Sequence, residues 1–450
     1  MKIKKLYIDG MFGDFTYNLN FEDIKDNVII LTAPNGYGKS TILKIIDDFF
    51  NMKFDDLFDE SFNLFTIEFD DQIVTVVKEN NLLVIYYGLG KVVEINKNIF
   101  RDNKKKFNNI LKNELSYMKK VKNNLWIDTR DDEVINTREM LERYNYIFPE
   151  DIVHVKLDDD LLQLLERDVF FVDADRLNNI NVSENNQEYS AINKLSKSIR
   201  QLMVDVKEKQ YAISMDQSSN FPEKVMSLLS EDIDIDVTKT INKIVKITRF
   251  DREYNENEIF GNLNLNPNII GKLRNEQIYD NKAFLMVLSS YLDDIIQRID
   301  TCAELAERIN LFKESVNSLL QFKNIDIHPA FGLIVEKKKD KDRVQDEKEI
   351  VDKKKIKSFN NGDFSINLLS SGEKHLIILL GDLIFNTKYG SVVLIDEPEI
   401  SLHAAWQKKL LGLIEKISQI NNFNVLIATH SFTLINGNWD NTIELAELIK

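Results

Sequence analysis

Four short segments place the strongest constraint on the fold of this 450-residue chain. They lie near its two ends, yet together they describe one nucleotide site, so the fold must bring the two ends together. The first runs from Ala33 to Thr41, and the other three are Leu369 to Glu373, Val392 to Pro398 and Ala428 to Ser431. In this order they are typical of a phosphate-binding loop, a second phosphate contact, a magnesium and water site, and a γ-phosphate sensor. We therefore expect both ends of the chain to fold around one nucleotide.

The first segment has the context that a phosphate loop needs. The apolar run Val28 to Leu31 precedes it as a predicted buried strand, and a helix is predicted from Ser40 to Phe50. Glycines let the loop curl so that its N–H groups point at phosphate oxygens, although Ala33 stands where the strict pattern has glycine. We expect Lys39 to bind the β- and γ-phosphates and the Ser40 hydroxyl to bind Mg²⁺. The predicted ATP-binding residues are Asn35, Gly36, Tyr37, Gly38, Lys39, Ser40 and Thr41.

Two carboxylates end the apolar run Val392 to Ile395, where ligands gather in open α/β sheets. Asp396 is expected to hold Mg²⁺ together with Ser40, and Glu397 to orient or deprotonate the attacking water. His430 follows a second apolar run and could hydrogen-bond the γ-phosphate. A lone histidine is more often a packed side chain, but the order of the other motifs favours the sensor. The predicted catalytic residues are Glu397 and His430.

The segment at Leu369 precedes a helix predicted to start near Lys374, and a helix N-terminus binds anions. This segment cannot easily bind the phosphates of the nucleotide in its own subunit if Lys39 already binds them. We therefore expect it to close on the nucleotide of a second subunit, in a homodimer or a higher homo-oligomer. The predicted contacts in trans are Ser370, Ser371, Gly372 and Glu373.

These segments resemble the ATP-binding cassette superfamily, in particular its SMC/OLD-like branch of DNA-metabolism and defence ATPases. The resemblance is carried by the serine-rich form at 369–375, by 396–403 with Trp406 and Gln407, and by 428–440. Within that branch the C-terminal stretch is similar to the ATPase subunit of Septu-type antiphage systems and of related retron ATPases. The resemblance implies ATP and Mg²⁺ as cofactors, and a sensor or regulatory subunit that works with a separate nuclease, of HNH type by preference or of TOPRIM type.

The resemblance also assigns two further segments. Ser401, Leu402 and His403 match the segment that crosses the dimer interface, with His403 where many relatives have an acidic residue. Asp173 and Arg176 occupy the place of the glutamine loop, in a stretch that lacks glutamine. Only twenty residues follow His430, so we expect the nuclease to be another chain.

The fold class implied is α/β, an ABC-type P-loop ATPase head whose mixed β-sheet core is joined by an antiparallel meander at 62–95. We expect residues 1–178 and 324–450 to form the two halves of this head around a helical insertion at 179–323. Apolar residues at spacings of three and four predict one helix from Ile192 and a second, about 40 residues long, from Leu288. Pro222 and Pro267 are expected to interrupt the region between them. A short antiparallel coiled coil and a plain helical subdomain both remain open.

The net charge of −15 argues against a surface devoted to nucleic acid. The basic stretch Arg101 to Lys122 is either one solvated helix face or a contact for nucleic acid or an acidic partner. The mixed charge run Glu336 to Lys357 is expected to be an exposed loop. One cysteine, Cys302, an N-terminus without a secretory signal, and no apolar run near the ~18 residues of a membrane span predict a cytoplasmic protein.

Three functions remain open at this stage. The first is a nucleotide-gated switch in which ATP closes the dimer, hydrolysis opens it, and the insertion relays the state to the nuclease. The second is a structural clamp in which ATP binding assembles a scaffold and hydrolysis matters little. The third is a DNA-end-binding repair ATPase of the SMC/RecF type, which would use the basic stretch.

Overall fold

The computed structural model describes the following parts of the chain: residues 2–24, 26–122, 125–130, 133–136, 140, 143–144, 146–148, 157–175, 180–181, 188–189, 191–230, 236–254, 260, 281–338 and 369–449. Two compact units form, one from Met1–Ala191 with Ser371–Lys450 and the other from Ile192–Ser370. The second unit therefore takes in more of the chain on its C-terminal side than the insertion at 179–323 that the sequence suggested.

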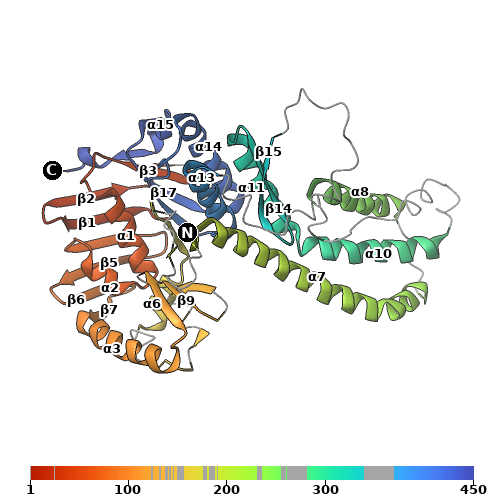
Figure 1. The fold of residues 1–450 in the computed structure, drawn as a ribbon, viewed down its shortest axis with the longest axis horizontal. Helices are drawn as coiled ribbons and strands as arrows, with labels where there is room; N and C mark the ends of the chain where they lie inside the picture. The colour runs from red at the N-terminus through yellow and green to blue at the C-terminus, as the bar shows by residue number, and fades with distance from the viewer. Residues whose placement is uncertain are drawn as a thin grey trace. The chain divides into compact units, whose positions relative to one another are not determined.

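The first unit is built on a five-stranded parallel sheet (Figure 1). Its strands lie in the order β11 (Val169–Val172), β16 (Val392–Asp396), β17 (Asn424–Thr429), β3 (Val28–Thr32) and β18 (Thr442–Glu444). Strands β3 and β16 are buried at every residue, as expected for parallel strands covered on both faces. Since β3 lies between β17 and β18, the N-terminal phosphate loop is placed among C-terminal strands.

A six-stranded antiparallel sheet completes the core of this unit, in the order β2-β1-β4-β5-β6-β7. It comprises β1 (Lys5–Met11), β2 (Phe15–Asn20) and the meander β4 (Leu64–Glu68), β5 (Ile73–Glu79), β6 (Leu82–Tyr87) and β7 (Lys91–Asn96). One apolar cluster joins residues of both sheets with helix α1 (Lys39–Phe50). The mixed α/β fold and the antiparallel meander are thus as predicted.

The first unit also contains further helices and strands. They are α2 (Phe54–Asp59), α3 (Lys97–Glu114), β8 (Met118–Lys122), β9 (Leu125–Asp128), β10 (Glu133–Asn136), α6 (Asp159–Leu165), α13 (Ser371–Gly381) with a π-helical turn at Asp382–Asn386, α14 (Ala404–Asn421) and α15 (Phe432–Ile435). The interpretation of 101–122 as one helix face was wrong, because α3 ends at Glu114 and Lys119, Lys120 and Lys122 lie on β8.

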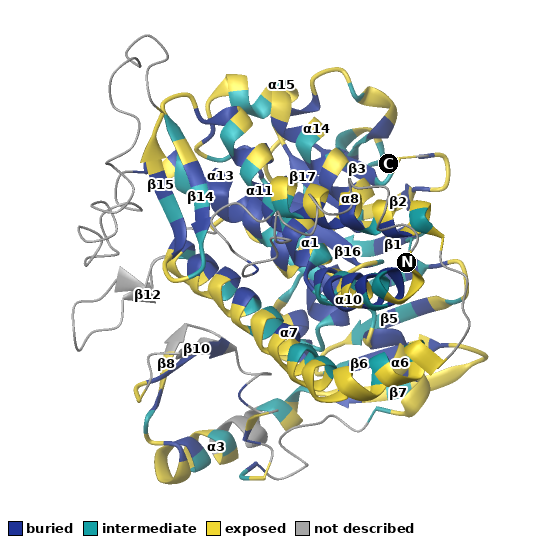
Figure 2. Ribbon diagram, turned by 90° about the vertical axis from the view of Figure 1, so that its right-hand side faces the viewer, coloured by how far each residue is buried: buried dark blue, intermediate teal, exposed yellow. Residues whose placement is uncertain are grey.

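The second unit is mostly helical and ends in a hairpin. It contains α7 (Ala191–Ser230), α8 (Val237–Tyr254), α10 (Lys282–Asp300) and α11 (Ala303–Leu319), followed by β14 (Lys323–His328) and β15 (Gly332–Lys337). Helices α7 and α10 are joined by side chains, since Gln210 donates to the carbonyl of Arg298 at 3.1 Å and Lys224 pairs with Asp294 at 2.6 Å. Figure 2 shows that much of α7 is exposed.

Two sequence predictions in this unit were wrong. The long helix is α7, with 40 residues, whereas the run from Leu288 to Leu320 breaks into α10 and α11 at Thr301 and Cys302. Pro222 does not interrupt the chain and lies inside α7, where it is exposed, so that water can reach the carbonyl left without a donor. Pro267, Arg176 and most of the charge run at 336–357 lie outside the described residues.

Cys302 is fully buried, and burial raises the pKa of its thiol to about 12. None of the helices in the described part of the chain is long and apolar enough to cross a membrane.

Candidate nucleotide site

The phosphate loop lies between β3 and α1, in the strand–loop–helix context that the sequence predicted. Gly36 and Gly38 adopt left-handed backbone, with φ of 93° and 82°, which favours glycine. Gly38 also lies against the end of β1, because a Cβ there would be 2.3 Å from the sulfur of Met11. A Cβ on Gly36 would meet nothing within 4 Å, so the loop is open at that residue.

Lys39 begins α1 and its ammonium is held inside the curl of the loop. Its Nζ donates to the carbonyl of Ala33 at 2.7 Å and to that of Pro34 at 3.3 Å, and only 6% of the residue is exposed. Ala33 does not need a glycine's freedom, since it is absent from the described residues with positive φ. A buried ammonium held by loop carbonyls is placed to exchange them for phosphate oxygens.

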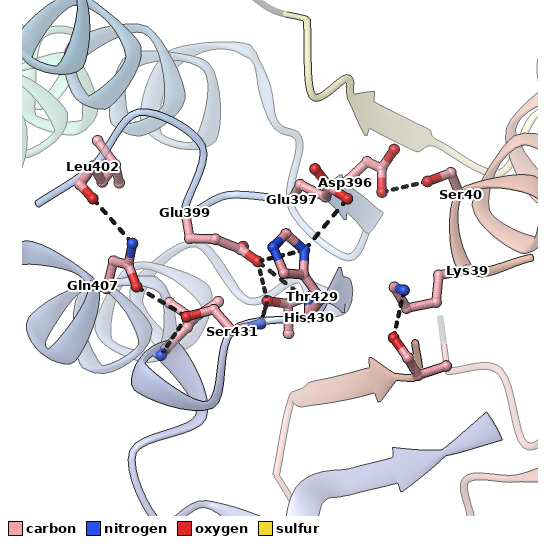
Figure 3. A network of polar contacts seen from close by, with 12 residues as sticks. Lys39, Ser40, Asp396, Glu397, Glu399, Leu402, Gln407, Thr429, His430 and Ser431 are labelled. Carbon is pink, nitrogen blue, oxygen red and sulfur yellow. Dashed lines mark hydrogen bonds and ion pairs between the residues drawn. The ribbon is translucent and has the colours of Figure 1, made fainter. Parts of the chain in front are cut away.

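Ser40 and Asp396 come from opposite ends of the sequence and are hydrogen-bonded. The hydroxyl of Ser40 on α1 donates to Asp396 Oδ1, at the end of β16, at 2.9 Å (Figure 3). Burial raises the pKa of Asp396, the bond from Ser40 opposes that rise, and the nearby charges of Glu397 and Asp173 add to it. The carboxylates of Glu397 and Asp173 thus lie close enough to Asp396 to repel its charge, and a bound cation would relieve that repulsion.

The donor set fits Mg²⁺. A hydroxyl and a carboxylate are hard oxygen ligands, and Mg²⁺ is usually bound through one or two such side chains together with phosphates and water. Within the described ranges, no group of three or more His, Cys, Asp or Glu residues that could hold a metal ion is found.

Asp173, the proposed glutamine-loop equivalent, lies at the same edge of the parallel sheet. Strand β11 pairs with β16 so that Val172 stands opposite Ile395, and the next residues along are Asp173 and Asp396. The structure thus brings Asp173 to the predicted metal site, whereas Arg176 lies outside the described residues.

Glu397 and His430 are close together, as Figure 3 shows. The Nδ1 of His430 is 3.5 Å from Glu397 Oε1 and 3.6 Å from Glu399 Oε1, and about half of the histidine side chain is exposed. Both carboxylates therefore lie beside the imidazole, which places the two predicted catalytic side chains next to each other. The main-chain N–H of Glu397 donates to the carbonyl of Ala428 at 2.8 Å, which fixes β16 against the strand that leads to the histidine.

The chain after β16 forms a tight turn from Glu397 to His403, here called the 397–403 turn. Two residues that are not glycine have positive φ in it, Glu397 at 44° and Ser401 at 62°. Leu402 is buried, and Nδ1 of His403 accepts a bond from the N–H of Ala405 as the cap of α14. His403 thus caps a helix.

The segment Leu369 to Glu373, here called the signature, leads into α13, and Glu373 lies in the first turn of the helix. Gly372 touches the 397–403 turn, since a Cβ on it would be 2.5 Å from the carbonyl oxygen of Ser401. This contact lies within one subunit and was not predicted. Ser370 and Ser371 are exposed at the N-terminal end of this helix.

Sequence reasoning also missed an aromatic group beside the phosphate loop. Phe12, in the turn between β1 and β2, is 47% exposed, and its ring is 3.1 Å from where a Cβ on Gly38 would be. Phe15 stacks on Tyr37 of the loop, with ring centroids 5.9 Å apart and planes 3° from parallel. The glycines on either side of Met11 and Phe12 were the available signal of a turn that presents an aromatic ring.

A family model described as "AAA domain, putative AbiEii toxin, Type IV TA system" matches residues 29–436. No curated protein matches the chain. Among solved structures, the Smc head domain with an extended coiled coil bound to the C-terminal domain of ScpA, from Pyrococcus furiosus, has a TM-score of 0.37 at 14% identity, over 96% of this chain and 90% of that one. The SMC head domain from Thermotoga maritima has a TM-score of 0.31 at 12% identity, over 97% and 91%. Since these TM-scores are below 0.5, the assignment depends on the family match.

Proposed function

Because the chain belongs to the AAA domain family of AbiEii type, we propose that it is an ATPase that closes as a homodimer on two molecules of ATP. In this proposal it is the sensor or regulatory subunit of an antiphage defence complex in the cytoplasm, and it controls a separate nuclease. The observation that carries the ATPase proposal is the bond between Ser40 and Asp396, which joins the phosphate loop to the carboxylate pair from the other end of the chain.

Each residue of the site has a distinct part in the proposed reaction. Lys39 binds the β- and γ-phosphates, and Ser40 and Asp396 hold Mg²⁺, which neutralises phosphate charge when bound. Glu397 orients the attacking water and accepts its proton, while His430 contacts the γ-phosphate. Asp173 lies at the same edge of the sheet as Asp396 and would add a second carboxylate near a bound Mg²⁺. Phe12 offers an aromatic face to the adenine base.

Dimerisation is supported by the exposed signature. Ser370 and Ser371 are exposed at the N-terminal end of α13, an 11-residue helix whose first N–H groups have no partner within the helix. In the closed dimer they meet the γ-phosphate bound by the partner, together with Gly372. The 397–403 turn would lie next to the opposing site.

The defence role rests on the sequence resemblance to Septu-type and retron ATPases and on the family description, which mentions a toxin of a type IV toxin–antitoxin system. A nuclease of HNH type is the preferred partner and one of TOPRIM type the second choice. Direct binding of nucleic acid is not part of the leading proposal, because the lysines of 101–122 divide between α3 and β8.

Turnover of ATP by the purified chain tests the proposal. We expect hydrolysis that Lys39→Ala abolishes, while Lys409→Ala, at an exposed position of α14, leaves it unchanged. Glu397→Gln should bind ATP–Mg²⁺ without turnover and accumulate as a dimer in light scattering. Equal turnover by Lys39→Ala and the wild type would contradict the assignment.

The same variant separates the switch from the clamp. If Glu397→Gln still restricts phage in cells, ATP binding alone suffices and the protein acts as a clamp. Loss of protection with an intact dimer means that cycling is needed, as the switch requires.

A further inference from the structure

His430 is bonded through its neighbours in the chain to the 397–403 turn, and the first link is Glu399. The hydroxyl of Thr429 donates to Glu399 Oε1 at 2.5 Å, and the main-chain N–H of His430 donates to the same oxygen at 3.3 Å (Figure 3). Glu399 is only 5% exposed, so these bonds lie in a region of low dielectric where they are strong. Within the described structure its other oxygen, Oε2, is buried with no hydrogen-bond partner.

The second link is Gln407, one turn into α14. Its Nε2 donates to the carbonyl of Leu402 at 3.0 Å, and its Oε1 accepts from the hydroxyl of Ser431 at 2.9 Å. Ser431 caps α15, because its Oγ also accepts the N–H of Leu434 at 3.2 Å. One amide therefore joins the 397–403 turn to the residue that follows His430.

The two links hold His430 from both sides of the chain. The residue before it is tied to Glu399 and the residue after it to Gln407, and both ties start from the same turn. That turn also carries Glu397 and touches Gly372 of the signature. Any displacement of the turn must consequently either break these bonds or move His430 with it.

We propose that Gln407 is a positioning residue that makes the 397–403 turn and His430 move as one body. A partner subunit that presses on the turn then adjusts the histidine at the γ-phosphate of the subunit to which the turn belongs. This rests on the proposed ATPase function of the site and adds a path by which each active site senses closure of the other. Gln407 touches neither phosphate nor water in this scheme and acts through Ser431.

The test replaces Gln407 by leucine, which keeps the bulk of the side chain and removes both amide bonds. We expect kcat for ATP to fall roughly tenfold with KM nearly unchanged, because hydrogen bonds that place a transition-state group are lost while ground-state binding is kept. Ser431→Gly removes the other end of the bond at little cost to the helix cap. The double variant should be no slower than either single variant, because both changes break one connection.

Hydrogen exchange of the amides at 428–436 provides a readout that does not need turnover. Exchange at Leu434 should be roughly tenfold faster in Gln407→Leu than in wild type and unchanged in the matched control Lys409→Ala. Unchanged exchange, additive effects in the double variant, or a rise in KM at constant kcat would each overturn the positioning role. If the wild type shows no Lys39-dependent hydrolysis, the ATPase proposal fails, and the exchange experiment still decides whether the link exists.

Discussion

The contact between Gly372 and Ser401 allows a sharp test of how closely the signature is coupled to the 397–403 turn. Gly372 lies inside α13 with ordinary helical backbone, so alanine suits its conformation and should favour the helix by roughly 0.5–1 kcal/mol. The added methyl, however, would be 2.5 Å from the carbonyl oxygen of Ser401. To reach the 3.0 Å that real contacts respect, or the 3.4 Å of ordinary contact, the two backbones must separate by 0.5 to 0.9 Å.

A shift of this size at the 397–403 turn should lower kcat. A misplacement of about 1 Å can cost roughly a hundredfold in rate, so we expect kcat of Gly372→Ala to fall between about tenfold and a hundredfold. The matched control is Gly412→Ala on α14, where the same methyl meets nothing within 4 Å. This control should keep full activity and gain a little stability.

Steady-state ATP turnover and thermal unfolding of both variants check the reasoning. We expect Gly372→Ala to lose turnover, and a crystal structure of it to show the carbonyl of Ser401 displaced. If Gly372→Ala and Gly412→Ala have equal kcat, the close approach is not needed for catalysis and the argued coupling is refuted.

The remaining predictions concern two buried carboxylates and Phe12, in the turn between β1 and β2. Burial raises the pKa of Asp48 from 3.8 to about 7, and the attraction of Lys53 opposes that rise. The folded state therefore binds the proton more tightly, and stability is lost as pH rises from about 4 to about 7, by up to about 4 kcal/mol. Asp48→Asn should raise the unfolding free energy at pH 8 but not at pH 4 in urea titrations, unlike Asp23→Asn at an exposed site. Asp396→Asn should abolish ATP turnover yet not lower the melting temperature at neutral pH, because burial raises the pKa of that carboxyl too; a melting temperature several degrees lower would contradict this. Phe12→Ala should weaken ATP binding roughly tenfold in titration calorimetry, whereas unchanged affinity would exclude the base contact.

The parts of the fold that local patterns determine were predictable. Val28 to Leu31 and Val392 to Ile395 are continuous apolar runs that end in loop or carboxylate residues, and both are buried strands of the parallel sheet. The meander was equally predictable, because turn residues at 70–71, 79–81 and 88–90 separate its β-branched and aromatic runs. In the structure β4 and β5 each bury one face.

The break between α10 and α11 could not be found in the same way. Ile299, Cys302 and Ala306 are all buried, so the apolar spacing continues across the break as if one helix ran through it. The periodicity of apolar residues shows which face of a helix is buried. Because the buried positions keep the same spacing from α10 into α11, the periodicity gives no sign of the break. Pro222 led to the opposite mistake, because a proline was expected to end the helix, whereas α7 continues beyond it and Lys224 there pairs with Asp294 of α10.

The candidate site shows the same division. The sequence pointed to Lys39, Ser40 and Asp396 through motif spacing, and the structure brings them together. The positions of Glu399 and Gln407 depend on hydrogen bonds between segments about 24 to 31 residues apart, for which no local pattern exists.

The 397–403 turn could not be predicted from the positions of glycines, because its two left-handed residues, Glu397 and Ser401, are not glycine. Glu397 and Ser401 adopt left-handed backbone that costs a residue with a Cβ of order 1 kcal/mol or more, and glycine would remove that cost at either place. Glycine at 397 would also remove the carboxylate that faces His430, so chemistry and backbone preference conflict there. The turn keeps its shape because Glu399, Leu402 and Ser401 are each held by a contact outside it. The left-handed backbone of Glu397 could therefore be identified only from the structure, which shows the contacts that hold the turn.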